Sequence, residues 1–460
     1  MLPSPHPLLD ATLRAAARRY RVPAVSQLSA HDAGAAAALA VSIEHARRAL
    51  AAGETPPPAL RHAFLAALAR LIREALREPG GDPVFQALLL RHRNASVREY
   101  AALSAGAARD RRDLVAAANT LAHPAKLERM PAAPPRAALA RLHAAAIAQS
   151  WAELARAADE LLGLPGACDP AVLQRLLAGP ALRRLQRLDA LASDAEVRRY
   201  RERWLSQGPA PGSVDAAAQG DASRERGAAV EALALRAMQA LARALNAAAD
   251  GAPYLAVSSM RVPPSIPASA ERAKSEWDAA LLRRAGGGNA APTWDVCLLL
   301  EAKASADAAA TDFPRLLRGL RLLAHADAQT DYPFRAREGG YALRGGSLRA
   351  LPTEGPALER AVLYFSDAPA DARPRLLSAA SRMQLLGADA SLDYAGRLTQ
   401  GEDAPAAMLE PVWTLLLESP QWAGVLQQYP MLRQARELMV HADDLMAAIA
   451  ASQSGHRAAP

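Results

Sequence analysis

An acidic and a basic side chain stand two residues apart at the end of an apolar segment of this 460-residue chain. Residues 293–305 read TWDVCLLLEAKAS, and Glu301 and Lys303 lie where a buried strand would stay apolar. Because side chains alternate along a strand, both point to the same face. A lysine ammonium can be desolvated and placed beside a scissile phosphate in a way that a guanidinium cannot. We therefore expect Glu301 and Lys303 to act on a phosphate group.

Lysine is rare in this chain, which makes its position informative. There are three lysines, Lys126, Lys274 and Lys303, against fifty-one arginines. Arginine would be expected at an ordinary surface position, so a lysine at the end of an apolar run is not explained by composition. This contrast supports a chemical function for Lys303, although an ion pair at the end of a strand would show the same pattern.

A divalent cation beside Glu301 would need at least one more carboxylate, because Mg²⁺ prefers oxygen ligands. Asp295 is a poor partner, since six residues of extended strand span about 20 Å. Asp278 is better placed, in a short strand that begins at Glu276, and residues 284–292 with their glycine run are typical of a hairpin turn. A turn centred between residues 289 and 290 would put Asp278 opposite Glu301.

The elements around these residues follow a recognisable order. A helix that begins at Ser223 carries Glu231 as its interior acid, and a strand is expected over residues 254–260. After the Glu-x-Lys segment, we expect a crossover helix over residues 311–326 and a further strand over residues 360–366.

Glu231, Asp278, Glu301 and Lys303, in this order and on these elements, resemble the PD-(D/E)xK nuclease superfamily over residues 220–400. The resemblance implies a restriction-endonuclease-like fold and a nuclease that depends on Mg²⁺, with Mn²⁺ as a substitute. It implies that Asp278 and Glu301 ligate the metal, that Glu231 contributes directly or through water, and that Lys303 holds the attacking water or stabilises charge on the phosphorane. Trp277 stands where the superfamily often has a proline.

The pattern along the chain predicts an α/β protein in several parts. Residues 1–205 are expected to form a large all-helical domain, residues 206–223 a linker, residues 224–400 the restriction-endonuclease-like mixed-sheet core, and residues 401–460 a helical C-terminal segment.

Charge is unevenly divided along the chain. Residues 1–205 hold 29 Lys+Arg and 19 Asp+Glu, and residues 206–460 hold 25 and 28. Arginine clusters in the first part suit phosphate contacts, although solvated helix faces would look the same; they include residues 18–21, 91–93, 109–112 and 198–201. The expected partner is nucleic acid, with DNA favoured over RNA, and the helical segments also suit a protein partner.

Two other interpretations stay open. Arg136 and His143 have a spacing similar to that of helical HEPN ribonucleases. Alternatively, the chain is a non-catalytic helical adaptor, or a nucleic-acid-binding protein, with a degenerate nuclease-like domain. The start lacks a secretory signal pattern and no apolar run is long enough to cross a membrane, so a cytoplasmic location without membrane contact is expected. The two cysteines also fit a reducing compartment.

Overall fold

The structure is a computed structural model that describes residues 7–25, 34–164, 168–206, 208, 213–248, 253–285, 292–372 and 374–457. The chain forms two compact units. The sheet unit contains residues 1–70, 211–385 and 409–460, and the helical unit contains residues 71–210 and 386–408.

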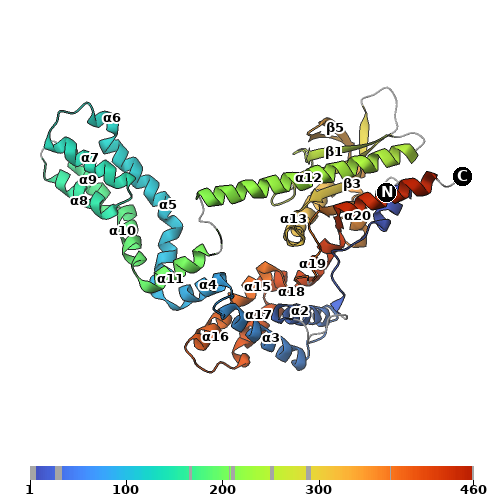
Figure 1. The fold of residues 1–460 in the computed structure, drawn as a ribbon, viewed down its shortest axis with the longest axis horizontal. Coiled ribbons are helices and arrows are strands. Elements are labelled where there is room, and N and C mark those ends of the chain that lie inside the picture. The colour runs from blue at the N-terminus through green and yellow to red at the C-terminus, as the bar shows by residue number, and fades with distance from the viewer. Residues whose placement is uncertain are drawn as a thin grey trace. The chain divides into compact units, whose positions relative to one another are not determined.

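A seven-stranded mixed sheet organises the sheet unit (Figure 1). Its strands are β1 (Tyr254–Arg261), β2 (Glu276–Arg284), β3 (Thr293–Ala302), β4 (Asp331–Ala336), β5 (Gly339–Arg344), β6 (Val362–Ser366) and β7 (Met439–His441). β1, β2 and β3 form an antiparallel meander, and β6 and β7 extend the sheet parallel to β3. β4 and β5 form a hairpin, of which β5 pairs with the first residues of β3.

The strands that the sequence predicted are confirmed as β1, β2, β3 and β6. The three others were not predicted, because β4 and β5 are short and partly exposed and β7 lies inside a helical pattern. Of the predicted hairpin turn over residues 284–292, residues 286–291 lie outside the described residues.

Helices cover both faces of the sheet. The helices of the sheet unit are α1 (Pro7–Ala15), α2 (Ala35–Ala51), the first part of α3 (Pro58–Leu76), α12 (Val214–Ala248), α13 (Ala306–Ala324), α14 (Gly345–Arg349), α15 (Ala379–Leu386), α17 (Glu410–Glu418), α18 (Ala423–Leu426), α19 (Gln428–Glu437) and α20 (Ala442–Arg457). One buried core joins the sheet to α1, α12 and α20. A second core joins the opposite face to α13 and the end of α19. The result is a three-layer arrangement in which β6 is buried along its whole length.

The long helix α12 begins earlier than the sequence predicted. The hydroxyl oxygen of Ser213 accepts a hydrogen bond from the backbone N–H of Ala216 at 3.1 Å, as is usual at a helix start. The helix then continues without a break from Val214 to Ala248, because its alanine-rich sequence favours helix throughout. The expected linker over residues 206–223 is therefore corrected: from residue 214 on, it is helix.

The expected division into a helical domain over residues 1–205 and a helical tail also differs from the structure. Leu9 and Leu13 of α1 are buried beside α12, and Tyr20 is buried in the opposite core. Residues 439–441 form a strand of the sheet, and α20 covers one face of it. Both ends of the chain thus complete the sheet unit, because they bury apolar side chains that the central segment alone would leave exposed.

The helical unit has its own core. Its helices are the last part of α3, α4 (Pro83–Arg93), α5 (Ala95–Ala122), α6 (Pro124–Leu127), α7 (Pro134–Ile147), α8 (Trp151–Leu162), α9 (Pro170–Ala178), α10 (Pro180–Ala192), α11 (Ala195–Leu205) and α16 (Asp389–Thr399). Helix α16 belongs here although it follows the sheet strands in sequence. A hydrogen bond of 2.6 Å from Arg93 to Thr399 and a contact of 2.8 Å between His92 and Asp393 attach it to α4.

Across the described residues, no helix combines the length and the apolar character that crossing a membrane requires.

Candidate active site

Strand register brings the two predicted carboxylates together. β2 and β3 pair antiparallel through Ala279 with Leu300 and Ala280 with Leu299. Continued by one residue, this register leads to Asp278 facing Glu301, and a carboxylate oxygen of Asp278 accepts a hydrogen bond of 2.8 Å from the backbone N–H of Ala302. Residues opposite each other on adjacent strands share a face of the sheet. The antiparallel pairing of β2 with β3 that the sequence suggested is therefore present in the structure.

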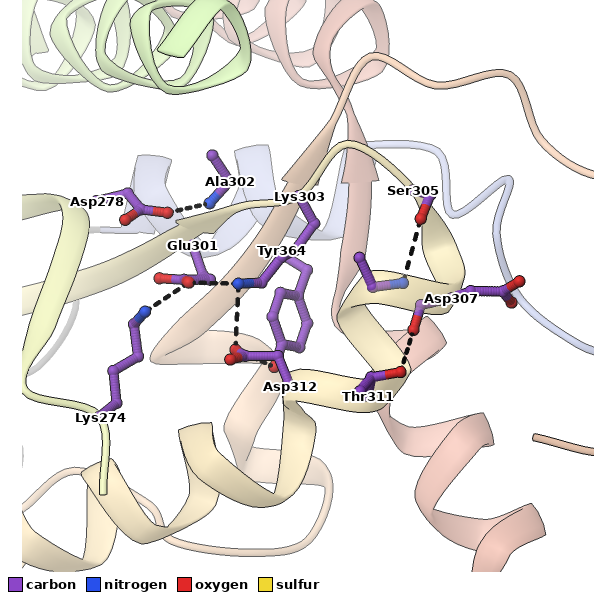
Figure 2. A network of polar contacts seen from close by, with 11 residues as sticks. Lys274, Asp278, Glu301, Ala302, Lys303, Ser305, Asp307, Thr311, Asp312 and Tyr364 are labelled. Carbon is purple, nitrogen blue, oxygen red and sulfur yellow. Dashed lines mark hydrogen bonds and ion pairs between the residues drawn. The ribbon is translucent and has the colours of Figure 1, made fainter. Parts of the chain in front are cut away.

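Glu301 is the most buried member of this group, with 2% of its surface exposed. Its Oε1 accepts a hydrogen bond of 2.7 Å from Lys303 Nζ and lies 2.5 Å from Lys274 Nζ (Figure 2). Its other oxygen, Oε2, is buried and has no hydrogen-bond partner among the described residues. A buried carboxylate oxygen without a partner is costly unless a ligand supplies one.

Lys303 lies between two acids. Its ammonium lies 3.4 Å from Asp312 of α13, whose carboxylate also accepts a hydrogen bond of 3.2 Å from the hydroxyl of Tyr364 on β6 (Figure 2). The backbone N–H of Lys303 donates to Phe365 at 2.8 Å, which anchors the residue to the neighbouring strand. Contacts from a helix and two strands thus hold the ammonium beside Glu301.

Glu231 reaches the other acids only through its charge. It lies on the exposed side of α12, and its charge helps raise the pKa of Asp278. The structure describes no hydrogen bond from Glu231 to Asp278, Glu301 or Lys303. Of the four predicted residues, only Glu301 and Lys303 are in direct polar contact, and Asp278 and Glu231 act on them or on each other through their charges.

Burial dominates the electrostatics of the carboxylates. It raises the pKa of Glu301 to about 7, and the negative charge of Asp278 adds to the rise, while Lys274 and Lys303 oppose it. Burial likewise raises the pKa of Asp278. For Lys303, burial works to lower the pKa, but the charge and hydrogen bond of Glu301 raise it overall. A carboxyl group whose ionisation is opposed by burial and by a neighbouring carboxyl group is suited to a cation that relieves this repulsion.

The residues present can hold one hard cation, though with few protein ligands. Asp278 and Glu301 offer carboxylate oxygens, and Oε2 of Glu301 is the orphaned buried atom that such a cation would satisfy. Within the described residues, no group of three or more His, Cys, Asp or Glu side chains is placed to hold a metal ion. Mg²⁺ commonly binds through one or two carboxylates and keeps several waters, so two protein ligands suffice.

Asp295 lies at the other end of β3 and is engaged elsewhere. Its carboxylate is buried and accepts hydrogen bonds of 2.7 and 2.5 Å from Arg344, with Arg283 at 3.5 Å. These partners satisfy the carboxylate locally, so Asp295 serves the packing of β3 against β5.

Sequence reasoning did not assign Lys274 or Asp312 to the site. Lys274 lies in the segment between β1 and β2, and Asp312 lies nearly two turns into α13. The rarity of lysine was a signal for Lys274, whereas nothing in the sequence distinguished Asp312 from the other acids of its helix.

The second constellation, Arg136 and His143, is not brought together. Arg136 donates to the carbonyl of Met130 at 3.2 Å, and His143 contacts Asn119 at 2.9 Å. Seven residues of helix separate the two along α7 by about 10 Å.

The two structural units have similar net charges, unlike the two parts of the sequence divided at residue 205. The helical unit carries 22 Lys+Arg and 19 Asp+Glu, and the sheet unit carries 32 and 28. Some of the clustered arginines are also paired with acids: Arg19 with Asp444 and Arg199 with Glu196. The uneven charge of the two sequence parts is therefore not a property of either unit.

Comparison with known proteins adds no relatives: no family model, no curated protein and no solved structure matches this chain.

Proposed function

We propose that the chain is a metal-dependent nuclease that hydrolyses phosphodiester bonds, with DNA favoured over RNA as the substrate. One observation carries this proposal: Asp278 stands opposite Glu301 across two buried strands, and Lys303 contacts the same Glu301 carboxylate. The element order from α12 through β1, β2, β3 and α13 to β6 supports it, because the resemblance to the PD-(D/E)xK superfamily implies these elements in this order.

The division of work follows from the contacts. Asp278 and Glu301 would hold a Mg²⁺ or Mn²⁺ ion, which when bound neutralises phosphate charge and lowers the pKa of its water. Lys303 supplies a fixed positive charge where negative charge develops on the phosphate. Asp312 and Tyr364 keep that ammonium oriented. Glu231 lies at the margin of the group and adds negative charge near Asp278.

The test is cleavage by the purified full chain. Wild type is incubated with single-stranded DNA, duplex DNA and RNA in Mg²⁺, Mn²⁺ or EDTA. Asp278→Asn and Glu301→Gln should each lower metal-dependent cleavage by more than about 100-fold, because ligand loss exceeds the effect of losing a supporting contact. Lys303→Met should lower turnover by about 100-fold or more, and Lys303→Arg should rescue it only in part.

Asp331→Asn is the matched control, since Asp331 is an exposed acid at the start of β4. It should cleave like wild type. Nucleic-acid binding in Ca²⁺, measured by fluorescence anisotropy, should be similar for all variants. The proposal fails if wild type cleaves none of the substrates, or if Asp278→Asn cleaves as well as wild type.

A second candidate, a non-catalytic nucleic-acid-binding or adaptor protein, has one observation in its favour. Two lysines already neutralise Glu301, and no third acid joins Asp278 and Glu301 within the described part of the chain. Binding of nucleic acid without cleavage in any metal would favour this candidate.

A further inference from the structure

Two of the three lysines in this chain meet at one carboxylate oxygen. Lys303 is expected there from the motif, but Lys274 arrives from the segment before β2, four residues ahead of Asp278. Both ammonium groups contact Oε1 of Glu301, at 2.7 and 2.5 Å. In a chain where arginine outnumbers lysine so strongly, this convergence indicates a requirement for small, compact cations at this point.

The residues around Lys274 bury its side chain and leave room for its stem. Lys274 is 4% exposed, and its ammonium lies 5.9 Å from the centre of the Trp277 ring. Its stem lies against Gly319 of α13, where a Cβ atom would come within 2.7 Å of the Lys274 Cβ. A hydrogen bond of 2.9 Å from the Val262 N–H to the Ser275 carbonyl fixes the adjoining backbone. Burying an ammonium this deeply is costly unless a charge partner accepts it, and Glu301 is that partner.

The two carboxylate oxygens of Glu301 have different surroundings, because both lysines contact the same oxygen. Oε1 receives both ammonium groups, and Oε2 is left buried without a hydrogen-bond partner among the described residues. Two-metal phosphodiesterases place two cations about 3.5–4 Å apart around shared ligands. Here positive charge from the protein already occupies the Oε1 side, so only the Oε2 side is open to an added cation.

We propose that Lys274 takes the place of a second cation, so that this site binds one divalent cation through Asp278 and Glu301. Lys274 is a positioning residue: it holds Glu301 through Oε1 and presents Oε2 to the cation. This inference rests on the proposed function, because it assumes that the paired carboxylates form a metal site. It adds the stoichiometry of that site and a residue outside the Glu-x-Lys motif.

The experiment is a Mn²⁺ titration of the full chain by isothermal calorimetry, without nucleic acid. Wild type should bind one Mn²⁺ per chain at this site, and Glu301→Gln should lose that binding. Lys274→Met keeps the apolar stem and removes the charge. It should bind Mn²⁺ about 10–100-fold more weakly, the usual effect of losing a group that supports a metal ligand. Lys274→Arg restores a cation with a larger head group and should recover part of the affinity.

Lys126→Met is the matched control, because Lys126 is the third lysine and is exposed in the helical unit. It should bind Mn²⁺ like wild type. Circular dichroism checks folding, and Lys274→Gln replaces Lys274→Met in the comparison if the methionine variant does not fold.

Three results overturn the inference: two Mn²⁺ ions bound at the site in wild type, wild-type affinity in Lys274→Met, or no gain from Lys274→Arg over Lys274→Met. The outcomes separate this inference from the proposed function. A wild type that binds one Mn²⁺ in a Lys274-dependent way but cleaves nothing refutes the nuclease and retains the inference. A wild type that cleaves nucleic acid, but whose Mn²⁺ affinity does not change in the Lys274 variants, retains the nuclease and refutes the inference. A wild type that binds no Mn²⁺ refutes both.

Discussion

The carboxyl group of Glu301 is buried between two lysines and faces a second carboxyl group across the strand pair. Its burial has opposite consequences for stability and for metal binding. Without a cation, ionising Glu301 leaves the buried Oε2 without a partner. With a cation at Asp278 and Glu301, the ionised form is favoured. Ionising Glu301 therefore lowers the stability of the metal-free fold, and a bound metal ion would remove this loss.

This cost predicts a pH-dependent stability. The pKa of Glu301 in the fold is about 7, above its ordinary value near 4.5. Between those pH values the folded chain keeps a proton that the unfolded chain releases, so the free energy of unfolding falls as pH rises. Metal-free wild type should lose on the order of 2–3 kcal/mol relative to Glu301→Gln between pH 4.5 and pH 8. Urea denaturation in EDTA at pH 5 and pH 8 measures the difference.

Asp331→Asn serves again as the control and should track wild type at both pH values. Added Mn²⁺ should narrow the gap at pH 8, because metal binding competes with the proton for the carboxylate. A difference between wild type and Glu301→Gln that stays constant with pH contradicts the prediction.

At the scale of elements, α13 serves the site in two places. Asp312 near its start contacts Lys303, and Gly319 two turns later leaves room for the stem of Lys274. Both lysines thus depend on the position of one helix, which follows β3 directly and packs on the same face of the sheet as Glu301.

Gly319→Ala should disturb the site without changing any charged residue. The added methyl group would lie 2.7 Å from the Lys274 Cβ and 3.3 Å from its backbone N and O, so the Lys274 segment or the helix must move. We expect a loss of about 1–3 kcal/mol in the free energy of unfolding, as for other overpacked sites, together with weaker Mn²⁺ binding. Urea denaturation and calorimetry measure the two effects.

Gly227→Ala on α12 is the matched control, because a Cβ atom there meets nothing within 4 Å. Alanine should leave Mn²⁺ binding unchanged and stabilise the helix by about 0.5–1 kcal/mol. Equal stability and equal Mn²⁺ affinity in the two variants would show that Gly319 does not set the place of Lys274.

At the scale of the molecule, segments distant in sequence complete each unit. Residues 1–70 and 409–460 belong with the sheet, and residues 386–408 belong with the helical unit. Removing residues 1–205 would therefore also remove residues 1–70 of the sheet unit, and would not take away a separate domain.

Deleting residues 1–25 should destabilise the sheet unit. The deletion removes Leu9, Leu13 and Tyr20, which are nearly fully buried in the two sheet cores. At about 1.5–3 kcal/mol for each buried side chain, we expect a loss on the order of 5 kcal/mol. Thermal and urea denaturation measure it. If the first 205 residues were instead an independent domain, the sheet unit would unfold at the same urea concentration with or without these residues.

Nucleic-acid binding, if it uses the helical unit, should depend on salt. Arg112 on α5 and Arg198 on α11 are exposed, and the two helices pack together. Each arginine that contacts a phosphate contributes about one to the slope of log affinity against log salt. Arg112→Ala and Arg198→Ala should each lower that slope by about one, measured by anisotropy from 50 to 200 mM salt. Unchanged slopes in both variants would place the nucleic acid elsewhere or favour a protein partner.

The sequence by itself determined four strands of the sheet unit and the shared side of Glu301 and Lys303 on β3. Alternating and apolar runs predicted β1, β2, β3 and β6, because strand periodicity is a local property. The register of the hairpin did not follow from the sequence, because its loop is long and the pairing of β2 with β3 shifts between Leu281 and Leu282. The side of Lys303 followed from strand alternation alone.

Only the tertiary structure decided which distant segments join these elements. The edge strand β7 is three residues long and is held by pairing with β6, so no local pattern marks it. The sequences of helices α1 and α20 show that each helix has an apolar face. They do not show that this face packs against α12 and the sheet, because that contact depends on the whole fold. Lys274 reached Glu301 because Gly319 admits its stem beside α13, a contact between residues 45 positions apart. Such contacts depend on packing between elements, which sequence periodicity does not encode.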